Sequence, residues 1–235
     1  MSTLTTCRAA TPGKLKFTSA VRIQESFLAG AERRTLLWLA QRMPAGINSD
    51  HLTILGFVSQ CMAGICYALA RWNADILLLG MLCLALNWFG DSLDGTVARV
   101  RNRQRPRYGF YVDHMADTIA AFFLMGGLAL SGYVHPGIAF GMLVAFLMLS
   151  TESYLATHTL GQFQLSYWKF GPTEIRILLA VGNLALLKHS MIQVFGRRCL
   201  LFDLGGAIAI AGMGLMLIVA AIRHTARLYR EERIL

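Results

Sequence analysis

Six long apolar runs recur along this chain and restrict its fold more than any other feature does. A bilayer core takes about 20 residues of α-helix to cross, and a spanning segment must satisfy its own backbone hydrogen bonds. Of the 235 residues, 55% are hydrophobic, which is more than an ordinary soluble domain carries. The sequence therefore predicts an all-α integral membrane protein with six transmembrane helices. The predicted spans are 52–70, 76–90, 118–134, 137–156, 175–187 and 204–222.

Basic residues indicate which side of the membrane each loop faces. Seven Lys or Arg lie in the first 42 residues, five Arg lie in 99–107 and four lie in 223–233. With six spans these regions share one side, which the positive-inside rule makes cytoplasmic. Lys188, Arg197 and Arg198 fall on the other side and conflict with this rule. We expect the polar ends of the second and third spans to face the cytoplasm, across a bacterial inner membrane or its equivalent.

An amphipathic helix is predicted before the first span, over residues 32–43, and Pro44 ends it. Such a helix either lies in the membrane interface among anionic lipids or packs on the bundle as an ordinary helix. Residues 1–30 are expected to be weakly ordered, and residues 31–235 to form one membrane domain. The predicted apolar face consists of Leu36, Leu39, Ala40 and Met43, with Arg33, Arg34 and Arg42 elsewhere on the helix.

Four of the seven aspartates lie within a short stretch beside apolar sequence. Asp91 and Asp94 are three residues apart and Asp113 and Asp117 four apart, so each pair shares one face of a helix. Carboxylates next to hydrocarbon are costly unless a positive charge compensates them. The pattern favours a pair of divalent ions held by oxygen ligands, Mg²⁺ or Mn²⁺ in preference to zinc. The alternative is that these acids are solvated and cap helices at the membrane surface.

The same residues resemble the signature of the CDP-alcohol phosphotransferases, which are membrane enzymes of phospholipid synthesis. That signature reads D-x-x-D-G-x-x-A-R, a short spacer, and G-x-x-x-D-x-x-x-D; the spacer here has nine residues. Before the first span, Asp50 and Thr53 are similar to the P-[ND]-x-x-T segment of this family, although Ser49 replaces its usual proline. The eight fixed positions of the signature are filled by Asp91, Asp94, Gly95, Ala98, Arg99, Gly109, Asp113 and Asp117.

This resemblance implies transfer of a substituted phosphate from a CDP-linked alcohol to an acceptor hydroxyl, with release of CMP. It implies two Mg²⁺ or Mn²⁺ ions held by the four aspartates, with Asp117 also acting as the general base. It also implies six spans preceded by an interfacial helix, as the hydropathy does. The residues implied to bind the CDP group are Asp94, Gly95, Ala98, Arg99 and Gly109.

A second polar patch, at the end of the fourth span and the start of the fifth, is the candidate acceptor site. Together with Asp113-His114 it resembles in part the choline/ethanolamine phosphotransferase branch, whereas in other branches an arginine near Arg176 faces an anionic acceptor. The alternative is that its charges form internal ion pairs. The donor is thus either a CDP-linked lipid or a CDP-linked head group, and the acceptor a small alcohol or diacylglycerol. The candidate acceptor residues are Glu152, His158, Lys169, Glu174 and Arg176.

A cation transport protein with an intramembrane carboxylate site is the rival class of function. It accounts for the acids but not for the glycines, alanine and arginine at fixed offsets from them. Nucleic acid is not an expected partner of a chain that mostly faces hydrocarbon. Contacts with membrane lipids are expected, and the resemblance to the family implies a homodimer. Gly126-Gly127 or Gly205-Gly206 would permit close contact between helices of two subunits.

Overall fold

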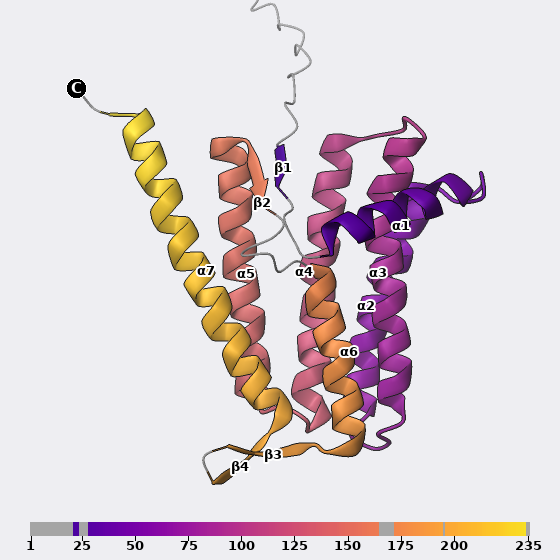
Figure 1. The fold of residues 1–235 in the computed structure, drawn as a ribbon, viewed down its shortest axis with the longest axis vertical. Coiled ribbons are helices and arrows are strands. Elements are labelled where there is room, and N and C mark those ends of the chain that lie inside the picture. The colour runs from indigo at the N-terminus through magenta and orange to yellow at the C-terminus, as the bar shows by residue number, and fades with distance from the viewer. Residues whose placement is uncertain (1–20, 24–27, 165–171, 195, 234–235) are drawn as a thin grey trace, which may run out of the picture.

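The computed structural model is a bundle of helices with two short pairs of strands (Figure 1). It describes residues 21–23, 28–164, 172–194 and 196–233. Most of the segment 1–30, which we predicted to be weakly ordered, lies outside these residues. The elements are β1 (Val21–Ile23), α1 (Ala29–Arg42), α2 (Ser49–Leu69), α3 (Ile76–Val100), α4 (Pro106–Ser131), α5 (Pro136–Leu160), β2 (Gln162–Gln164), α6 (Pro172–Lys188), β3 (Met191–Val194), β4 (Arg197–Leu200) and α7 (Leu201–Glu231).

Prolines and glycines set several helix boundaries. Both α4 and α5 begin with a proline in the first turn, where the missing N–H costs nothing, and His135 Nδ1 accepts from Gly137 N at the start of α5. Gly132 and Gly161 follow these two helices with φ values of 78° and 65°. Glycine adopts such left-handed angles without a Cβ penalty, so both helices end there.

Among the described residues, five helices are long and apolar enough to cross a membrane: α2, α3, α4, α5 and α7. Both α3 and α4 extend well beyond their predicted spans, into the polar signature. The predicted fifth span corresponds to α6, which has 17 residues and is too short to count by this measure. Residues 165–171, which precede α6, lie outside the description, so the sixth span stays a prediction.

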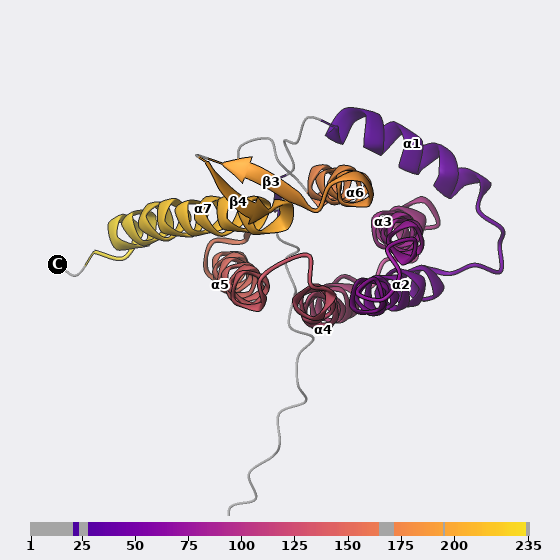
Figure 2. The ribbon, with the colours of Figure 1, turned by 90° about the horizontal axis from the view of Figure 1, so that it is seen from below.

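The long helices form a ring, in the order α7, α5, α4, α2, α3 and α6 when seen from below (Figure 2). Each neighbouring pair in this order is in contact, including α6 and α7, which close the ring. The main core lies between α2, α3 and α4 and includes Tyr67, Leu77 and Leu128, each exposed by 1% or less. The short strands lie at the margins: β1 pairs with β2 in parallel, and β3 and β4 form an antiparallel hairpin between α6 and α7.

Helix α1 crosses the other helices instead of running along them (Figure 1). Leu36 and Ala40 are buried against α2 and α3, and Leu39 and Met43 pack on the same cluster, so the predicted apolar face covers the bundle. Trp38 lies on the outer side and is 54% exposed. The fold thus presents a second, partly apolar side of α1 outward, and its position in a membrane interface remains a prediction.

Glycines allow α2 to pack tightly against both neighbours. A Cβ on Gly90 of α3 would lie 2.5 Å from the Leu52 carbonyl oxygen of α2, and a Cβ on Gly127 of α4 would collide with the backbone of Gly64. Small residues at such contacts are how membrane helices approach closely. Gly127, which we had considered for contact between subunits, therefore packs within one chain.

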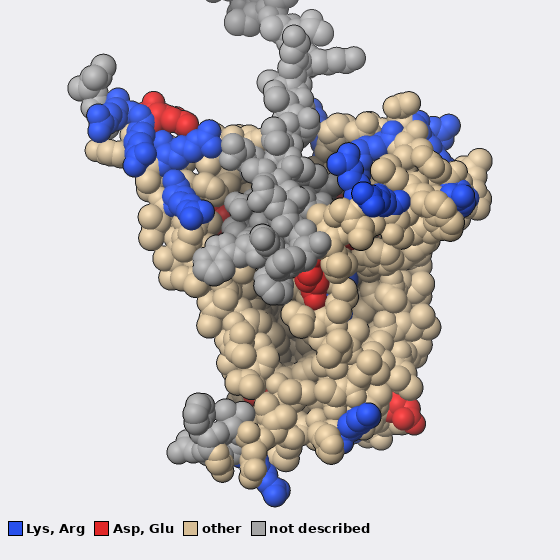
Figure 3. Space-filling model, in the orientation of Figure 1, with Lys and Arg blue, Asp and Glu red and all other residues tan. Residues whose placement is uncertain are grey.

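Basic side chains gather at one end of the molecule (Figure 3). This end carries α1 and the C-terminal end of α7, whereas the opposite end, with the β3–β4 hairpin, shows fewer of them. The asymmetry agrees with the charge distribution on which the topology prediction was based.

The contact between α2 and α4 predicts that alanine substitution lowers stability at one of two adjacent glycines and not at the other. Gly127→Ala is expected to destabilise the protein by about 1–3 kcal/mol, because its methyl group has no room beside Gly64. Gly126→Ala is the matched control, since no atom lies within 4 Å of a Cβ there. The thermal midpoints of both variants in detergent measure the difference. Equal midpoints would contradict the packing described here.

Candidate functional site

Three of the four signature aspartates come together in the ring. Asp91 lies in the second half of α3, and Asp113 and Asp117 lie in the first half of α4, which runs back beside it. Each offers one carboxylate oxygen, and these oxygens all lie within 4.8 Å of one another. Like charges this close repel each other, so the group attracts cations.

Asp94 lies one turn further along α3 and lines the same cleft. Its Oδ2 accepts a hydrogen bond of 2.7 Å from the Thr53 hydroxyl of α2, and its Oδ1 accepts from the Gly95 backbone. The cleft is formed by α2, α3 and α4. Its lining residues are Thr53, Gly56, Phe57, Gln60, Asn87, Asp91, Asp94, Asp113, Ala116, Asp117 and Ala120.

The donor atoms around this cleft suit a hard divalent cation. The clustered ligands are carboxylate oxygens without a cysteine or histidine among them, which is the set that Mg²⁺ and Mn²⁺ prefer. Asp91, Asp113 and Asp117 would hold an ion, and Asp94 adds a fourth carboxylate at the rim. The observed geometry thus fits the predicted ligands, although it does not identify an ion.

Arg176 of α6 reaches into the same site. Its Nη2 donates to Asp91 Oδ2 at 2.5 Å, and its Nε donates to Asn87 Oδ1 at 2.9 Å. Asn87 is buried and in turn donates to the Gly56 carbonyl and to Gln60, both at 3.0 Å. A chain of polar contacts that ends at Asp91 therefore connects α2, α3 and α6.

The other candidate acceptor residues lie elsewhere or outside the description. Glu152 pairs with His224 Nδ1 of α7 at 2.5 Å, and Glu174 accepts from the Leu28 backbone at 3.0 Å. His158 is exposed near the end of α5, and Lys169 lies outside the described residues. Of this set, Arg176 is the residue that the structure places beside the aspartates.

The remaining signature residues lie around the loop between α3 and α4. Arg99 donates to Thr96 at 2.9 Å, and a Cβ on Gly95 would come within 3.5 Å of the Arg99 guanidinium. Gly109 has open space where a Cβ would be. Ala98 lines a separate surface groove beside the start of α2. The absence of a side chain at both glycines leaves room for a ligand near the rim of the cleft.

Sequence reasoning missed Asn87, Gln60 and the contact that Thr53 makes with Asp94. A usable signal exists for Asn87, because it precedes Asp91 by four residues inside an apolar run and so shares its helix face. Gln60 and Thr53 lie on another helix, and their part in the site follows only from the packing of α2 against α3.

The cluster predicts different metal affinities for two aspartate variants. Asp91→Asn is expected to weaken Mn²⁺ binding about tenfold or more, because it removes one of three clustered charges and keeps the shape. Asp75→Asn is the control, since Asp75 is exposed at the opposite end of α3. Electron paramagnetic resonance of free Mn²⁺ measures both. Unchanged affinity in the Asp91 variant would show that the ion binds elsewhere.

Comparison with known proteins adds an independent finding. Residues 47–222 match the sequence model of the family described as CDP-alcohol phosphatidyltransferase. An archaetidylinositol phosphate synthase of Pyrococcus horikoshii is 30% identical over 105 residues, which cover 45% of this chain and 53% of the relative. One of Methanothermobacter thermautotrophicus is 31% identical over 111 residues, which cover 47% of this chain and 52% of the relative. The chain thus spans about half the length of the curated relatives that it matches.

Proposed function

This chain belongs to the CDP-alcohol phosphatidyltransferase family, and from that membership we propose that it transfers a substituted phosphate from a CDP-linked alcohol to an acceptor hydroxyl. CMP is the second product, and the reaction serves phospholipid biosynthesis. The observation that carries the proposal is the convergence of Asp91, Asp113 and Asp117 in a cleft that Asp94 also lines. These are the four acidic positions of the family signature.

The signature residues are proposed to divide the binding of the donor between them. Asp94, Gly95, Ala98, Arg99 and Gly109 are proposed to bind the CDP group at the end of the cleft near the loop between α3 and α4. A divalent ion, when held by the aspartates, neutralises the diphosphate and stabilises the departing CMP. Mg²⁺ and Mn²⁺ both fit the oxygen ligands, and two ions are proposed from the four carboxylates.

Asp117 is the proposed general base. Its carboxylate takes the proton of the acceptor hydroxyl, and the hydroxyl oxygen attacks the β-phosphorus of the donor. A bond forms between this oxygen and the β-phosphorus while the bond to the bridging oxygen of CMP breaks. The proton stays on Asp117 until it passes to solvent, so the step balances without a covalent enzyme intermediate.

Arg176 supports an anionic acceptor. Its guanidinium lies beside Asp91. From there it would bind the phosphate of an alcohol phosphate whose hydroxyl group lies at the aspartates. Both relatives are named archaetidylinositol phosphate synthases, which also favours an inositol phosphate type of acceptor with a CDP-linked lipid as donor. Glu152, His158, Lys169 and Glu174 remain proposed as outer parts of this acceptor site.

The alternative within the same family is the use of CDP-choline or CDP-ethanolamine with diacylglycerol. An aromatic group beside the aspartates favours it, because His114 stacks on Phe110 at 4.1 Å and meets Tyr154 edge-on at 4.8 Å. Such rings attract quaternary ammonium groups. Cation transport through the carboxylates is the alternative of another class.

We also propose a location and an assembly. Asp91 and Asp94 of α3 and Asp113 and Asp117 of α4 lie in the halves of these helices next to the connecting loop, which carries Arg101, Arg103 and Arg105. This position supports the proposal that the active site faces the cytoplasm under the positive-inside rule. Residues 31–235 are proposed to act as one membrane domain, and the protein as a homodimer surrounded by membrane lipids.

A substrate panel tests these proposals. Detergent-solubilised protein is given labelled CDP-diacylglycerol with inositol phosphate, glycerol phosphate or serine, and labelled CDP-choline with diacylglycerol. Metal-dependent CMP release with an alcohol phosphate supports the favoured assignment, and release only from CDP-choline supports the alternative. Absence of CMP release from every pair, together with cation flux in vesicles, would leave transport as the explanation.

Asp117→Asn is expected to fold and insert normally but to lose turnover by about 10²–10⁴-fold, because the amide keeps the shape and cannot take a proton. CMP release at saturating metal measures the loss. Asp203→Asn is the control, since Asp203 of α7 accepts from the backbone N–H of His135, just before α5, and lies outside the cleft. Near-normal turnover by the Asp117 variant would refute its role as the base.

A further inference from the structure

Glu32, near the start of α1, collects three hydrogen bonds on a single carboxylate oxygen. Its Oε1 accepts from Trp88 Nε1 at 3.1 Å and from Ser92 Oγ at 3.5 Å, both on α3. It also accepts from Thr173 Oγ1 of α6 at 2.6 Å, which is the shortest of the three. The other oxygen, Oε2, is buried and has no partner among the described residues. A partly buried carboxylate with one buried oxygen depends strongly on its few donors.

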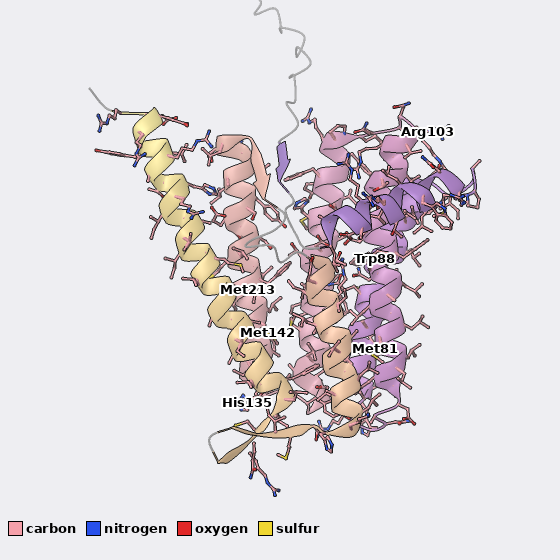
Figure 4. The ribbon with its side chains drawn as sticks, in the orientation of Figure 1. Met81, Trp88, Arg103, His135, Met142 and Met213 are labelled. Atoms are coloured by element: carbon pink, nitrogen blue, oxygen red, sulfur yellow. The ribbon has the colours of Figure 1, made fainter. Side chains whose placement is uncertain are left out.

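Two adjacent faces of α3 connect Glu32 to the aspartates. Trp88 and Ser92 are four residues apart and contact α1, while Asn87 and Asp91 are four apart and contact α6. Trp88 lies at the level where α1 crosses the beginning of α6 (Figure 4). The position of α1 and the geometry around Asp91 are therefore set along the same two turns of one helix.

The first turn of α6 both donates a hydrogen bond to the start of α1 and accepts one from the residue before α1. Thr173 donates to Glu32, and one residue later Glu174, only 8% exposed, accepts from the Leu28 backbone at 3.0 Å. Arg176 follows Thr173 by three residues and so projects from the same side of the helix. A displacement of Thr173 thus moves the base of the arginine that contacts Asp91.

We propose that Glu32 is a positioning residue for the reaction: through Thr173 it fixes the first turn of α6 and holds Arg176 against Asp91. This inference rests on the proposed function. The Arg176 cation lies 2.5 Å from Asp91 Oδ2, where it opposes a divalent ion at the same carboxylate and is placed to receive an anionic acceptor. Helix α1 therefore tunes both the metal affinity and the acceptor affinity of the cleft.

Matched variants at Thr173 test this link. Thr173→Val keeps the shape and removes the hydroxyl donor, whereas Thr173→Ser keeps the donor. We expect Thr173→Val to tighten Mn²⁺ binding about threefold, since Arg176 is less firmly held against Asp91, and Thr173→Ser to bind Mn²⁺ like the wild type. Electron paramagnetic resonance of free Mn²⁺, without substrate, is the measurement. Equal affinity of the valine and serine variants would overturn the proposal.

A double-mutant cycle separates positioning from general loosening. Thr173→Val is expected to have no further effect on Mn²⁺ affinity in an Arg176→Gln background, because it acts through that arginine. Leu36→Ala removes packing of α1 and leaves the Glu32 contacts, so it should lower the thermal midpoint without changing Mn²⁺ affinity. Additive effects of Thr173→Val and Arg176→Gln on Mn²⁺ affinity would overturn the assignment. So would a change of Mn²⁺ affinity in Leu36→Ala as large as that in Thr173→Val.

Kinetics with the alcohol phosphate found by the substrate panel add a second readout. Thr173→Val should raise the KM for this acceptor about threefold or more with little change in kcat, and Thr173→Ser should restore it. A kcat effect without a KM effect would overturn the proposed link. A wild-type protein that binds no Mn²⁺ and releases no CMP would refute the proposed function itself, a result distinct from equal behaviour of the Thr173 variants.

Discussion

The close approach of α2 to α3 and α4 is the contact on which the cleft depends. Gly90 meets the backbone of α2 near Leu52 and Gly56, and Gly127 meets Gly64, so no side chain separates these helices at either point. Inside a bilayer the hydrophobic effect does not drive helices together, and close backbone packing with interhelical hydrogen bonds takes over. The contact at Gly90 lies one residue before Asp91. It therefore fixes the height at which Asp91 faces the aspartates of α4, and it brings the Thr53 hydroxyl of α2 within 2.7 Å of Asp94.

The tight scaffold holds like charges close together, and this gives the site its attraction for cations. Three carboxylate oxygens lie within 4.8 Å of one another, an arrangement that would separate if the helices were free to move apart. Part of the compensation comes from Arg176, whose guanidinium contacts Asp91, and part is supplied by a cation when one binds. The protein thus stores electrostatic repulsion in a rigid frame, and a ligand that relieves it gains binding free energy.

The spacing of the aspartates along the sequence made their shared helix faces predictable. Most of their partners could not be predicted, because they lie far away along the chain. The intervals within Asp91–Asp94 and Asp113–Asp117 fix shared helix faces whatever the fold, and the apolar face of α1 at Leu36 and Ala40 follows from the same periodicity. In contrast, Arg176 reaches Asp91 across 85 residues and Thr173 reaches Glu32 across 141. Such pairs depend on the order of helices in the ring, and hydropathy carries no information about that order. The same limit applies to Glu152, whose partner His224 lies on a helix that pairs with α5 only in the folded ring.

Helix α6 is attached to the ring in a different manner from the glycine-packed helices, and this difference divides the site into two parts. Its leucines pack on the main core, and polar contacts hold it as well: Asn183 and Tyr67 exchange hydrogen bonds of 2.7 and 3.0 Å in the core, and Glu32 and Asn87 bind Thr173 and Arg176 near its start. Each hydrogen bond is directional and can be removed by one isosteric substitution, whereas any side chain added at a glycine backbone contact forces the two helices apart. The aspartates therefore lie on helices that pack through glycine backbone contacts, and Arg176 lies on a helix whose start is held by side-chain hydrogen bonds. Under the proposed function Arg176 receives an anionic acceptor, so the hydrogen bonds at the start of α6 are the contacts where substitutions would change acceptor affinity.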